Sequence, residues 1–462
     1  RLITNNMEFK KYNHVIEESL ISALWEKKGC FKPKSGKAKK TFSMVIPPPN
    51  VTGRLHMGHA LNNSLQDVLV RFYRMRGYET LWQPGTDHAG IATQAIVEKN
   101  LEKEGFNKND LGREKFIKKV WEWKDKSGGI ILDQLKKLGC SCDWSRTRFT
   151  MDKDLSNAVI KVFVDLYNKK LIYKDKKLVN WDTALQTAIS DLEVVQKESQ
   201  SNLYFISYQI EDSNEKITIA TTRPETMMGD TAIAVNPKDK RYLNLVGKNV
   251  IIPLVNRRIK IITDHYADPE QGSGAVKITP AHDFNDYMVG KRNKLQIINI
   301  FEKDGKINSN GIKGFVGLDR FEARKLIINK LKENDQLVKI EQIKNKVPYG
   351  DRSNTIIEPL LTEQWFVNAK FLSKKPIEIV KKRKTSFYPE NWKKIFFQWM
   401  NEIEPWCISR QIWWGHRIPA WYDEKHNIYV AENEKKALLL AREKNKNKII
   451  KLKQETDVLD TW

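Results

Sequence analysis

The sequence predicts an α/β protein in which a parallel-sheet core is interrupted by a β-rich module. An apolar strand, a helical pattern and a second strand follow one another between residues 41 and 83. Residues 95–180 carry mainly helical patterns, whereas alternating apolar residues and turn residues predominate from about Val195. Strand–helix–strand order favours parallel pairing, and alternation with tight turns favours antiparallel hairpins. Because 462 residues exceed one typical domain, we expect roughly two or three units.

The stretch Pro47–Ala60, PPPNVTGRLHMGHA, follows the first predicted strand, Thr41–Ile46. Its run of prolines excludes both a helix and a central strand at this point. Gly53 permits a tight bend, and a helix is expected to open near His56. The unpaired N–H groups and the positive dipole at a helix start bind phosphate oxygens. This stretch therefore predicts an anion-binding loop at the end of the strand.

The paired histidines of this loop are candidate catalytic residues. His56 and His59 are three residues apart, so on a first helical turn they share one face. Such a pair would donate hydrogen bonds to ATP phosphates and stabilise the charge that forms when a carboxylate attacks the α-phosphate. Gly58 would let the nucleotide approach the backbone. The alternative is an ordinary polar helix start, and the strand, prolines and loop in front favour the functional interpretation.

A second strand and an acidic residue complete this unit. Helical spacing from Leu61 to Phe72 ends at Gly77, and Glu79–Gln83 is a predicted strand. The unit is Rossmann-like, and ligands of such sheets bind at the carboxyl ends of the strands. Asp87 follows the second strand there. Its carboxylate would bind an amino acid's ammonium group or cap the next helix, and the sequence leaves both roles open.

Charge and cysteine content restrict the partners and the compartment. Lys and Arg number 80 against 57 Asp and Glu, a formal charge of +23, which suits a polyanion such as RNA. The alternative is a lysine-rich composition that fills solvated faces.

The four cysteines form no CxxC pair, so we expect no metal site, no disulfide scaffold and a cytoplasmic protein. No apolar run reaches membrane-span length. The role of residues 1–40 is not indicated.

Two stretches of the β-rich module carry polar chemistry: TTRPETMMGDTAI, residues 221–233, and GSGAVKITPAHDFNDY, residues 272–287. We expect boundaries of 1–194 for the first part of the core, 195–345 for the module and 346–462 for the return to the core. Paired carboxylates would hold an ammonium group and orient a water, and residues two apart on a strand share a face. A loop of capping carboxylates is the alternative. The candidate pocket residues are Arg223, Thr226, Lys277, Thr279, Asp283 and Asp286.

These motifs together resemble the class I aminoacyl-tRNA synthetases. Pro47–Ala60 is similar to their HIGH signature in the form typical of the valine enzymes, and the two polar stretches resemble the editing domain of the valine, isoleucine and leucine enzymes. The resemblance continues at intervals to Trp462. It implies a ligase that activates valine with ATP and Mg²⁺, transfers it to tRNA(Val) and hydrolyses mischarged threonyl-tRNA(Val), acting as a monomer without a membrane.

The resemblance also implies individual residues. Asp87 would hold the ammonium group of valine, while His56, Gly58 and His59 would bind ATP. Trp421 and Trp462 would line the side chain of valine, and Trp406, Trp413 and Trp414 are alternatives to Trp421 in that role. The implied valine-binding set is Pro48, Asn50, Asp87, Trp421, Val458 and Trp462, and the implied editing set is the six residues of the candidate pocket.

The KMSKS motif of the family does not occur in this sequence. We therefore expect this chain to keep the editing determinants and to form valyl-adenylate poorly. An isoleucine- or leucine-type synthetase is one alternative. A small-molecule nucleotidyltransferase with the HxGH loop is another, but it would not use the β-rich module. A non-enzymatic RNA-binding module is a third, and it would need neither Asp87 nor the paired histidines.

Overall fold

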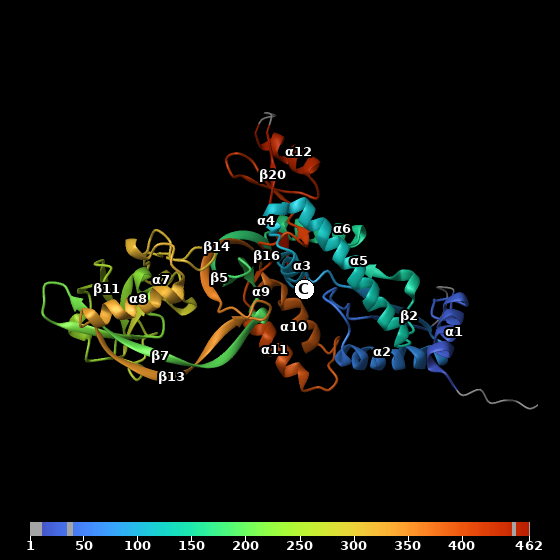
Figure 1. Cartoon of the computed structure of the whole chain (residues 1–462), viewed down its shortest axis with the longest axis horizontal. Helices are drawn as coiled ribbons and strands as arrows, with labels where there is room; N and C mark the ends of the chain where they lie inside the picture. The colour runs from blue at the N-terminus through green and yellow to red at the C-terminus, as the bar shows by residue number, and fades with distance from the viewer. Residues whose placement is uncertain (1–11, 35–39, 446–449, 462) are drawn as a thin grey trace, which may run out of the picture. The chain divides into compact units, whose positions relative to one another are not determined.

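The computed structural model describes residues 12–34, 40–445 and 450–461 (Figure 1). The described chain divides into two compact units. The first comprises the residues up to Val164 together with those from Ile412 onward, and the second is Asp165–Gln411. Both combine helices with sheets, so the predicted α/β class is confirmed. The predicted boundaries at 195 and 345 stay predictions.

The first unit contains the strand–helix–strand core and a small C-terminal part. Its helices are α1 (His14–Lys27), α2 (Met57–Met75), α3 (Gly90–Lys103), α4 (Lys108–Leu111), α5 (Arg113–Lys137), α6 (Lys153–Asn168), which continues past Val164 into the second unit, and α12 (Glu434–Lys444). Its strands are β1 (Thr41–Val45), β2 (Glu79–Gln83), β3 (Gly85–Thr86), β4 (Arg148–Phe149), β17 (His416–Arg417), β18 (Ala420–Tyr422), β19 (Ile428–Val430), β20 (Lys453–Gln454) and β21 (Val458–Leu459).

The predicted strand–helix–strand unit is confirmed. β1 pairs in parallel with β2, in a register that joins Thr41 to Glu79 and Val45 to Gln83. α2 connects the two strands, and its inner side contributes Val70 to a core that holds Trp82 of β2 and apolar residues of α5. Since the strands are parallel, both end at one edge, where the chain continues into Pro47–Asn50 and Gly85–Asp87.

The second unit is rich in strands. Its helices are α7 (Phe284–Arg292), α8 (Arg320–Glu333), α9 (Ala369–Leu372), α10 (Lys374–Lys381) and α11 (Trp392–Glu402). Its strands are β5 (Ile172–Asp182), β6 (Thr187–Ile189), β7 (Val194–Ile210), β8 (Lys216–Thr221), β9 (Ala232–Val235), β10 (Asn249–Ile251), β11 (Arg258–Thr263), β12 (Ala275–Ile278), β13 (Leu337–Gly350), β14 (Glu358–Val367), β15 (Trp406–Cys407) and β16 (Ser409–Arg410).

A seven-stranded mixed sheet organises this unit in the order β12-β9-β11-β10-β7-β13, with β8 paired to β7. The predicted hairpin is confirmed as β7 and β8. β7 and β13 form a long antiparallel ribbon (Figure 1). β13 was not predicted, because most of its residues are exposed or half-buried and it lacks a regular apolar alternation. β14 and β5 form the centre of a separate four-stranded sheet.

The sheet's inner face forms the main apolar core of this unit, and it includes Tyr208 and Ile206 of β7, Ile233 of β9 and Ile327 of α8. β9 and β12 are antiparallel neighbours, joined from Ala232–Ile278 to Val235–Ala275. This pairing places the chain before β9 beside the end of β12. The two polar stretches therefore meet at one end of the sheet.

No helix among the described residues has both the length and the apolar composition that crossing a membrane requires.

Candidate functional site

The start of α2 is a capping box made by the two histidines. His56 is the N-cap residue, and its Nδ1 accepts the backbone N–H of Gly58 at 3.1 Å. Nδ1 of His59 in turn accepts the backbone N–H of His56 at 3.3 Å. The two rings lie 4.0 Å apart between centroids. The sequence predicted a shared face for these rings, and the structure brings them together.

This capping geometry fixes the protonation pattern of the rings. A neutral imidazole that accepts at Nδ1 carries its proton on Nε2. Burial and the neighbouring His56 lower the pKa of His59, so its neutral form predominates near pH 7. His56 is exposed and His59 half-buried. The pair therefore offers Nε2–H donors at a helix start, where an anion is also favoured by the helix dipole.

Gly58 is required by the close approach of His56. A Cβ at this position would lie 3.0 Å from Cε1 and 3.1 Å from Nδ1 of the His56 ring. A side chain at this position would therefore press on the ring, which would have to shift by a few tenths of an ångström.

Asp87 lies beside the loop that leaves β1. Its backbone N–H donates to Pro49 O at 2.9 Å, its O accepts from Val51 N at 3.0 Å, and Asn50 forms a bridge with it. The structure thus brings Asn50 and Asp87 together at the carboxyl ends of the parallel strands. Pro48 is exposed in the same loop.

The Asp87 carboxylate is oriented by two neighbours. Its Oδ1 accepts from Thr150 Oγ1 at 2.9 Å and lies 3.2 Å from His88 Nδ1. Burial raises the pKa of Asp87, but the hydrogen bond and charge of His88 and the bond from Thr150 outweigh it, so the pKa lies below its usual value. The side chain of Asp87 is 32% exposed. It is an accessible carboxylate, suited to an ammonium group.

The tryptophans considered for the valine site lie in two different clusters. Trp421 packs in a separate cluster with Tyr429 and alanines of α12. Trp414 packs instead with Val51, and its Nε1 donates to His88 O at 2.8 Å. Of the competing tryptophans, the described contacts connect Trp414 to the Asp87 segment. The sequence contains no pattern that distinguishes Trp414 from Trp421 in this respect.

Val458 fits the Trp414 side of this region. β21 pairs with β17, and Val458 is joined to Arg417. A Cβ at Gly415 would lie 3.0 Å from Cγ2 of Val458, so this side chain fills the space beside the residue that follows Trp414. Trp462 lies outside the described residues.

The second group of predicted residues lies where the chain before β9 meets the end of β12. Lys277 Nζ donates to Thr226 Oγ1 at 2.7 Å and also to Thr279 Oγ1. It forms an ion pair with Asp230 Oδ1 at 3.1 Å. These side chains are buried. The structure brings Lys277, Thr279 and Thr226 together in one buried cluster, and their place in a binding pocket stays a prediction.

The two predicted aspartates differ. Asp283 is exposed and is the N-cap of α7, where its Oδ1 accepts from Asn285 N and Asp286 N. The capping alternative thus applies to Asp283. Asp286 is only 6% exposed, and its Oδ2 accepts from Thr279 N at 2.8 Å. Burial and the nearby Asp283 raise the pKa of Asp286 to about 7, against the opposing charge of Lys277.

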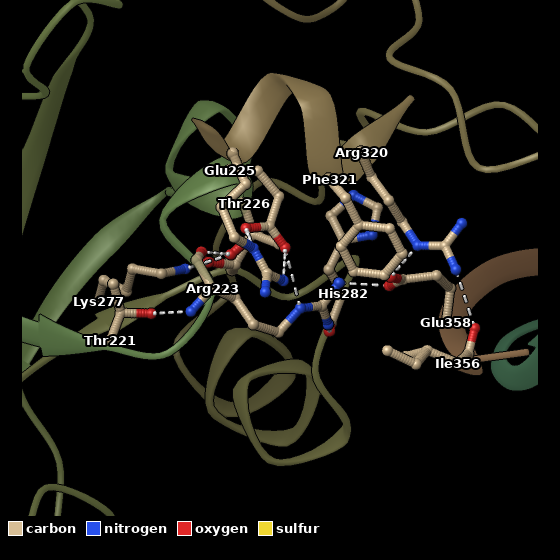
Figure 2. A network of polar contacts seen from close by, with 12 residues as sticks. Thr221, Arg223, Glu225, Thr226, Lys277, His282, Arg320, Phe321, Ile356 and Glu358 are labelled. Carbon is tan, nitrogen blue, oxygen red and sulfur yellow. Dashed lines mark hydrogen bonds and ion pairs between the residues drawn. The ribbon is translucent and has the colours of Figure 1, made fainter. Parts of the chain in front are cut away.

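Arg223 is held by a network of acids. Its guanidinium donates to Glu358 and, at 2.9 Å, to His282 O, and it lies 3.4 Å from Glu225 Oε1. Glu225 is also bound by Arg324 at 2.7 Å. Figure 2 shows the network extending from Lys277 and Thr226 through Arg223 to Glu358 and Arg320. The guanidinium of Arg223 is therefore engaged within the protein.

Several residues of this second group were missed from the sequence. Asp230 and Tyr208 lie beneath Lys277, and Glu225 and Glu358 hold Arg223. Asp230 and Glu225 lie in the polar stretch 221–233, but nothing in their spacing distinguishes them from capping residues. Among the described residues, no group of three or more His, Cys, Asp or Glu would hold a metal ion.

Comparison with known proteins gives a family and several relatives. Residues 20–462 match the family described as tRNA synthetases class I (I, L, M and V). The chain is 67% identical over 456 residues to the valine–tRNA ligase of Pelagibacter ubique, covering 99% of this chain and 52% of that protein. It is 53% identical over 466 residues to that of Caulobacter vibrioides, covering 96% of this chain and 51% of the relative. It is 52% identical over 453 residues to that of Francisella tularensis, covering 98% of this chain and 49% of the relative.

Two observations point to the same class of protein. They are the strand–helix–strand unit with its histidine-capped helix and the family match over nearly the whole chain. The chain belongs to the class I tRNA synthetases of the isoleucine, leucine, methionine and valine group. The three relatives named above are all valine–tRNA ligases, and the chain spans about half of their length. Family membership favours the synthetase interpretation over a small-molecule nucleotidyltransferase and over an RNA-binding module.

Proposed function

We propose that the chain is the part of a valine–tRNA ligase that contains an amino-acid-activating site and a hydrolytic editing site. In the whole enzyme, activation would take place at His56, His59 and Asp87, and editing at Lys277, Thr279 and Asp286 together with the rest of the predicted pocket. Without the KMSKS motif, the 462-residue chain would bind valyl-adenylate but form it poorly. The substrates would be valine, ATP and tRNA(Val), in a monomeric, cytoplasmic protein. The observation that carries the proposal is the presence of both groups in one chain that resembles valine–tRNA ligases over 99% of its length.

In the activating site, the accessible Asp87 carboxylate would bind the ammonium group of valine and leave its carboxylate free to attack. Attack on the α-phosphorus forms the acyl phosphate bond and breaks the bond to pyrophosphate. The Nε2–H groups of His56 and His59 would stabilise the developing charge on the phosphoryl oxygens. ATP would arrive with Mg²⁺, which neutralises phosphate charge. Asn50, Pro48, Val458 and Trp414 are proposed to surround the side chain of valine.

A second site follows from the chemistry of valine. A pocket that accepts two methyl groups discriminates poorly against threonine, which replaces one methyl by a hydroxyl of nearly the same size. Threonine would therefore reach tRNA(Val). A separate pocket lined by hydroxyl and ammonium groups accepts the threonine hydroxyl, whereas a valine methyl would leave those groups unpaired.

The hydrolytic step needs a positioned water. Its oxygen would bond to the ester carbonyl carbon while one proton passes to the Asp286 carboxylate. The bond to the ribose oxygen then breaks, and that oxygen takes the proton, which releases threonine and free tRNA. Asp283, whose capping bonds both use Oδ1, is the group proposed for the ammonium of threonine. Arg223 is proposed to hold the loop in place through Glu225 and Glu358.

Binding of a non-hydrolysable valyl-adenylate analogue tests the activating site. The Asp87→Asn variant should bind it about 30-fold more weakly, because truncating a charged partner costs about 2 kcal/mol at a partly exposed site. The measurement is isothermal titration calorimetry. An analogue without the amino group should bind the unmodified chain and Asp87→Asn equally.

Asp67→Asn is the matched control in the same unit. Asp67 lies on α2 and pairs with Arg71 of that helix and with Ser141, which follows α5, and not with the proposed ligand. The affinity of this variant for the analogue should equal that of the unmodified chain. Equal affinity of the Asp87→Asn variant and the unmodified chain would exclude Asp87 as the ammonium site.

A further inference from the structure

Residues 370–394 of the second unit concentrate positive charge. This stretch contains nine Lys and Arg against two Glu, a formal charge of +7, whereas the whole chain of 462 residues carries +23. It includes the end of α9, the whole of α10 and the start of α11 (Figure 1). Composition alone left open whether the excess charge serves a polyanion or fills solvated faces. The contacts of this stretch distinguish the two explanations.

Acidic residues pair with only three of these nine cations. Glu378 pairs with Lys382 and, at 3.8 Å, with Lys375, and Glu390 pairs with Lys393 at 3.5 Å. The other six cations are exposed, and they form no ion pair within the described part of the chain. They are Lys370, Lys374, Lys381, Arg383, Lys384 and Lys394. Because like charges repel one another, a cluster of this kind is typical of a surface that binds an anion.

The turn that ends α10 carries an arginine where a glycine is usual. Arg383 N donates to Val380 O at 3.1 Å and Lys384 N donates to Ile379 O at 3.0 Å, which is a Schellman motif. Its left-handed position is occupied by Arg383, with a φ of 56°. A side chain there destabilises the turn relative to glycine, and the helix dipole favours cations only within the last turn of the helix. Termination of the helix therefore does not account for the arginine.

Exposed aromatic rings lie next to these cations in the chain. Phe387 packs against Phe396 of α11, with ring centroids 5.2 Å apart, and so fixes the loop against that helix. The neighbouring Tyr388 is wholly exposed, and Trp392 is 52% exposed. Four residues of chain span at most about 14 Å, so Tyr388 lies within about that distance of Lys384. Rings beside cations are the combination that binds a single-stranded nucleic acid, since the rings stack on bases and the cations contact phosphates.

We infer that the end of α10, the loop that follows it and the start of α11 form a binding surface for single-stranded RNA. Lys381, Arg383 and Lys384 contact the phosphates, and Tyr388 and Trp392 stack on unpaired bases. The inference rests on the proposed function for the source of this RNA, which is an unpaired segment of tRNA(Val). An anionic membrane also attracts cations and aromatic rings, but membership in a family of tRNA synthetases favours RNA.

The test measures the affinity of the 462-residue chain for tRNA(Val) and for a short single-stranded RNA, by fluorescence anisotropy at several salt concentrations. The variant Lys381→Gln/Arg383→Gln/Lys384→Gln should bind both RNAs more weakly. The slope of the logarithm of the association constant against the logarithm of the salt concentration should become shallower by about 2, because each phosphate contact on a single strand contributes about 0.7. This change corresponds to about 100-fold in affinity between about 1 M and about 0.1 M salt.

The matched control is Lys325→Gln/Lys330→Gln/Lys332→Gln, which removes three exposed lysines of α8 in the same unit. It changes the net charge of the chain by the same amount. Its affinity for both RNAs should stay within about 3-fold of that of the unmodified chain, because salt screens charges that do not contact the RNA.

Tyr388→Ala tests the stacking contribution separately. Because Tyr388 is wholly exposed, its removal takes no buried contact from the protein. The affinity for single-stranded RNA should fall by about 5-fold or more, with an unchanged salt slope, since stacking is not an ionic interaction. The affinity for a fully paired RNA duplex should not change.

The outcomes separate this inference from the proposed function. If the unmodified chain binds tRNA(Val) and the triple variants of α10 and α8 bind it equally, the inference is overturned and the proposed function stands. If the α10 variant yields no folded protein, an unchanged affinity of Tyr388→Ala for single-stranded RNA overturns the inference. Loss of binding to phosphatidylserine vesicles in the α10 variant, with RNA binding kept, would identify a membrane surface and also overturn it. A chain that binds no RNA but hydrolyses threonyl-tRNA(Val) contradicts this inference alone, whereas failure in both assays contradicts the proposed function as well.

Discussion

Replacing Lys277 by methionine is expected to destabilise the sheet around β9 and β12 by about 3–5 kcal/mol, because it leaves the buried Asp230 without its counter-charge. The side chain of Asp230 is 0% exposed and that of Lys277 8%. Methionine has a similar length, so loss of volume adds little. Hydrogen exchange of the β9 and β12 amides measures this local free energy of opening.

Two further variants make the expected result specific to the buried pair. The double variant Lys277→Met/Asp230→Asn should recover much of the loss, since removing both charges leaves no unpaired ion. Lys248→Met removes an exposed pair with Glu215, whose side chains are 44% and 54% exposed, and should change the same free energy by less than about 1 kcal/mol. Equal losses in Lys277→Met and Lys248→Met would contradict the buried ion pair.

Replacing Asp286 by asparagine is expected to lower hydrolysis of threonyl-tRNA(Val) by about 10²–10⁴-fold, which is the range that a general base contributes. Asparagine still accepts from Thr279 N through its amide oxygen, so the bond at 2.8 Å can persist while the base is lost. Initial rates of release of radiolabelled threonine measure the effect. Asp264→Asn, which removes a carboxylate bound by Arg292 in the same unit, should keep the rate within about 3-fold.

The pH dependence follows from the same carboxyl. The pKa of Asp286 is raised to about 7, so the base form appears as pH rises through 7, and the enzymatic rate should rise over that range. Stability moves the other way. Between about pH 4 and pH 7 the folded state keeps the proton on Asp286, whereas the unfolded state has lost it. The free energy of unfolding therefore falls as pH rises, by about 1 kcal/mol between pH 6 and pH 8. Both dependences should be absent in Asp286→Asn, and a rate that is flat across pH 6 to 8 in the unmodified chain would contradict this role.

Local patterns predicted the elements that position the proposed activating site. The bounds of β1, α2 and β2 follow from an apolar strand, helical spacing and a glycine, and all three are close to those observed. The parallel order then placed Asp87 beside the loop of β1 without knowledge of the fold. Its partner Thr150 lies 63 residues further along the chain, and no local pattern connects the two.

The sequence predicted which residues of the second group lie close together, but it did not predict the hydrogen bonds and ion pairs among them. Lys277 and Thr279 share a strand face, which the two-residue period of a strand reveals. Whether Arg223 reaches a ligand depends on Glu358, which is 135 residues away, and its donors are used there. Trp421 and Trp414 lie in one tryptophan-rich stretch, and only tertiary packing places the first with α12 and the second beside His88.

The central claim is that one chain carries both a site suited to valyl-adenylate and a separate hydrolytic pocket for the wrong amino acid. Its most direct test compares the rates at which the unmodified 462-residue chain releases threonine from threonyl-tRNA(Val) and valine from valyl-tRNA(Val), each corrected for spontaneous hydrolysis. We predict that threonine is released at least about 10-fold faster than valine, because only the threonine hydroxyl can form a hydrogen bond with the polar groups of the proposed pocket. Equal release of both amino acids, or none above the spontaneous rate, would contradict it.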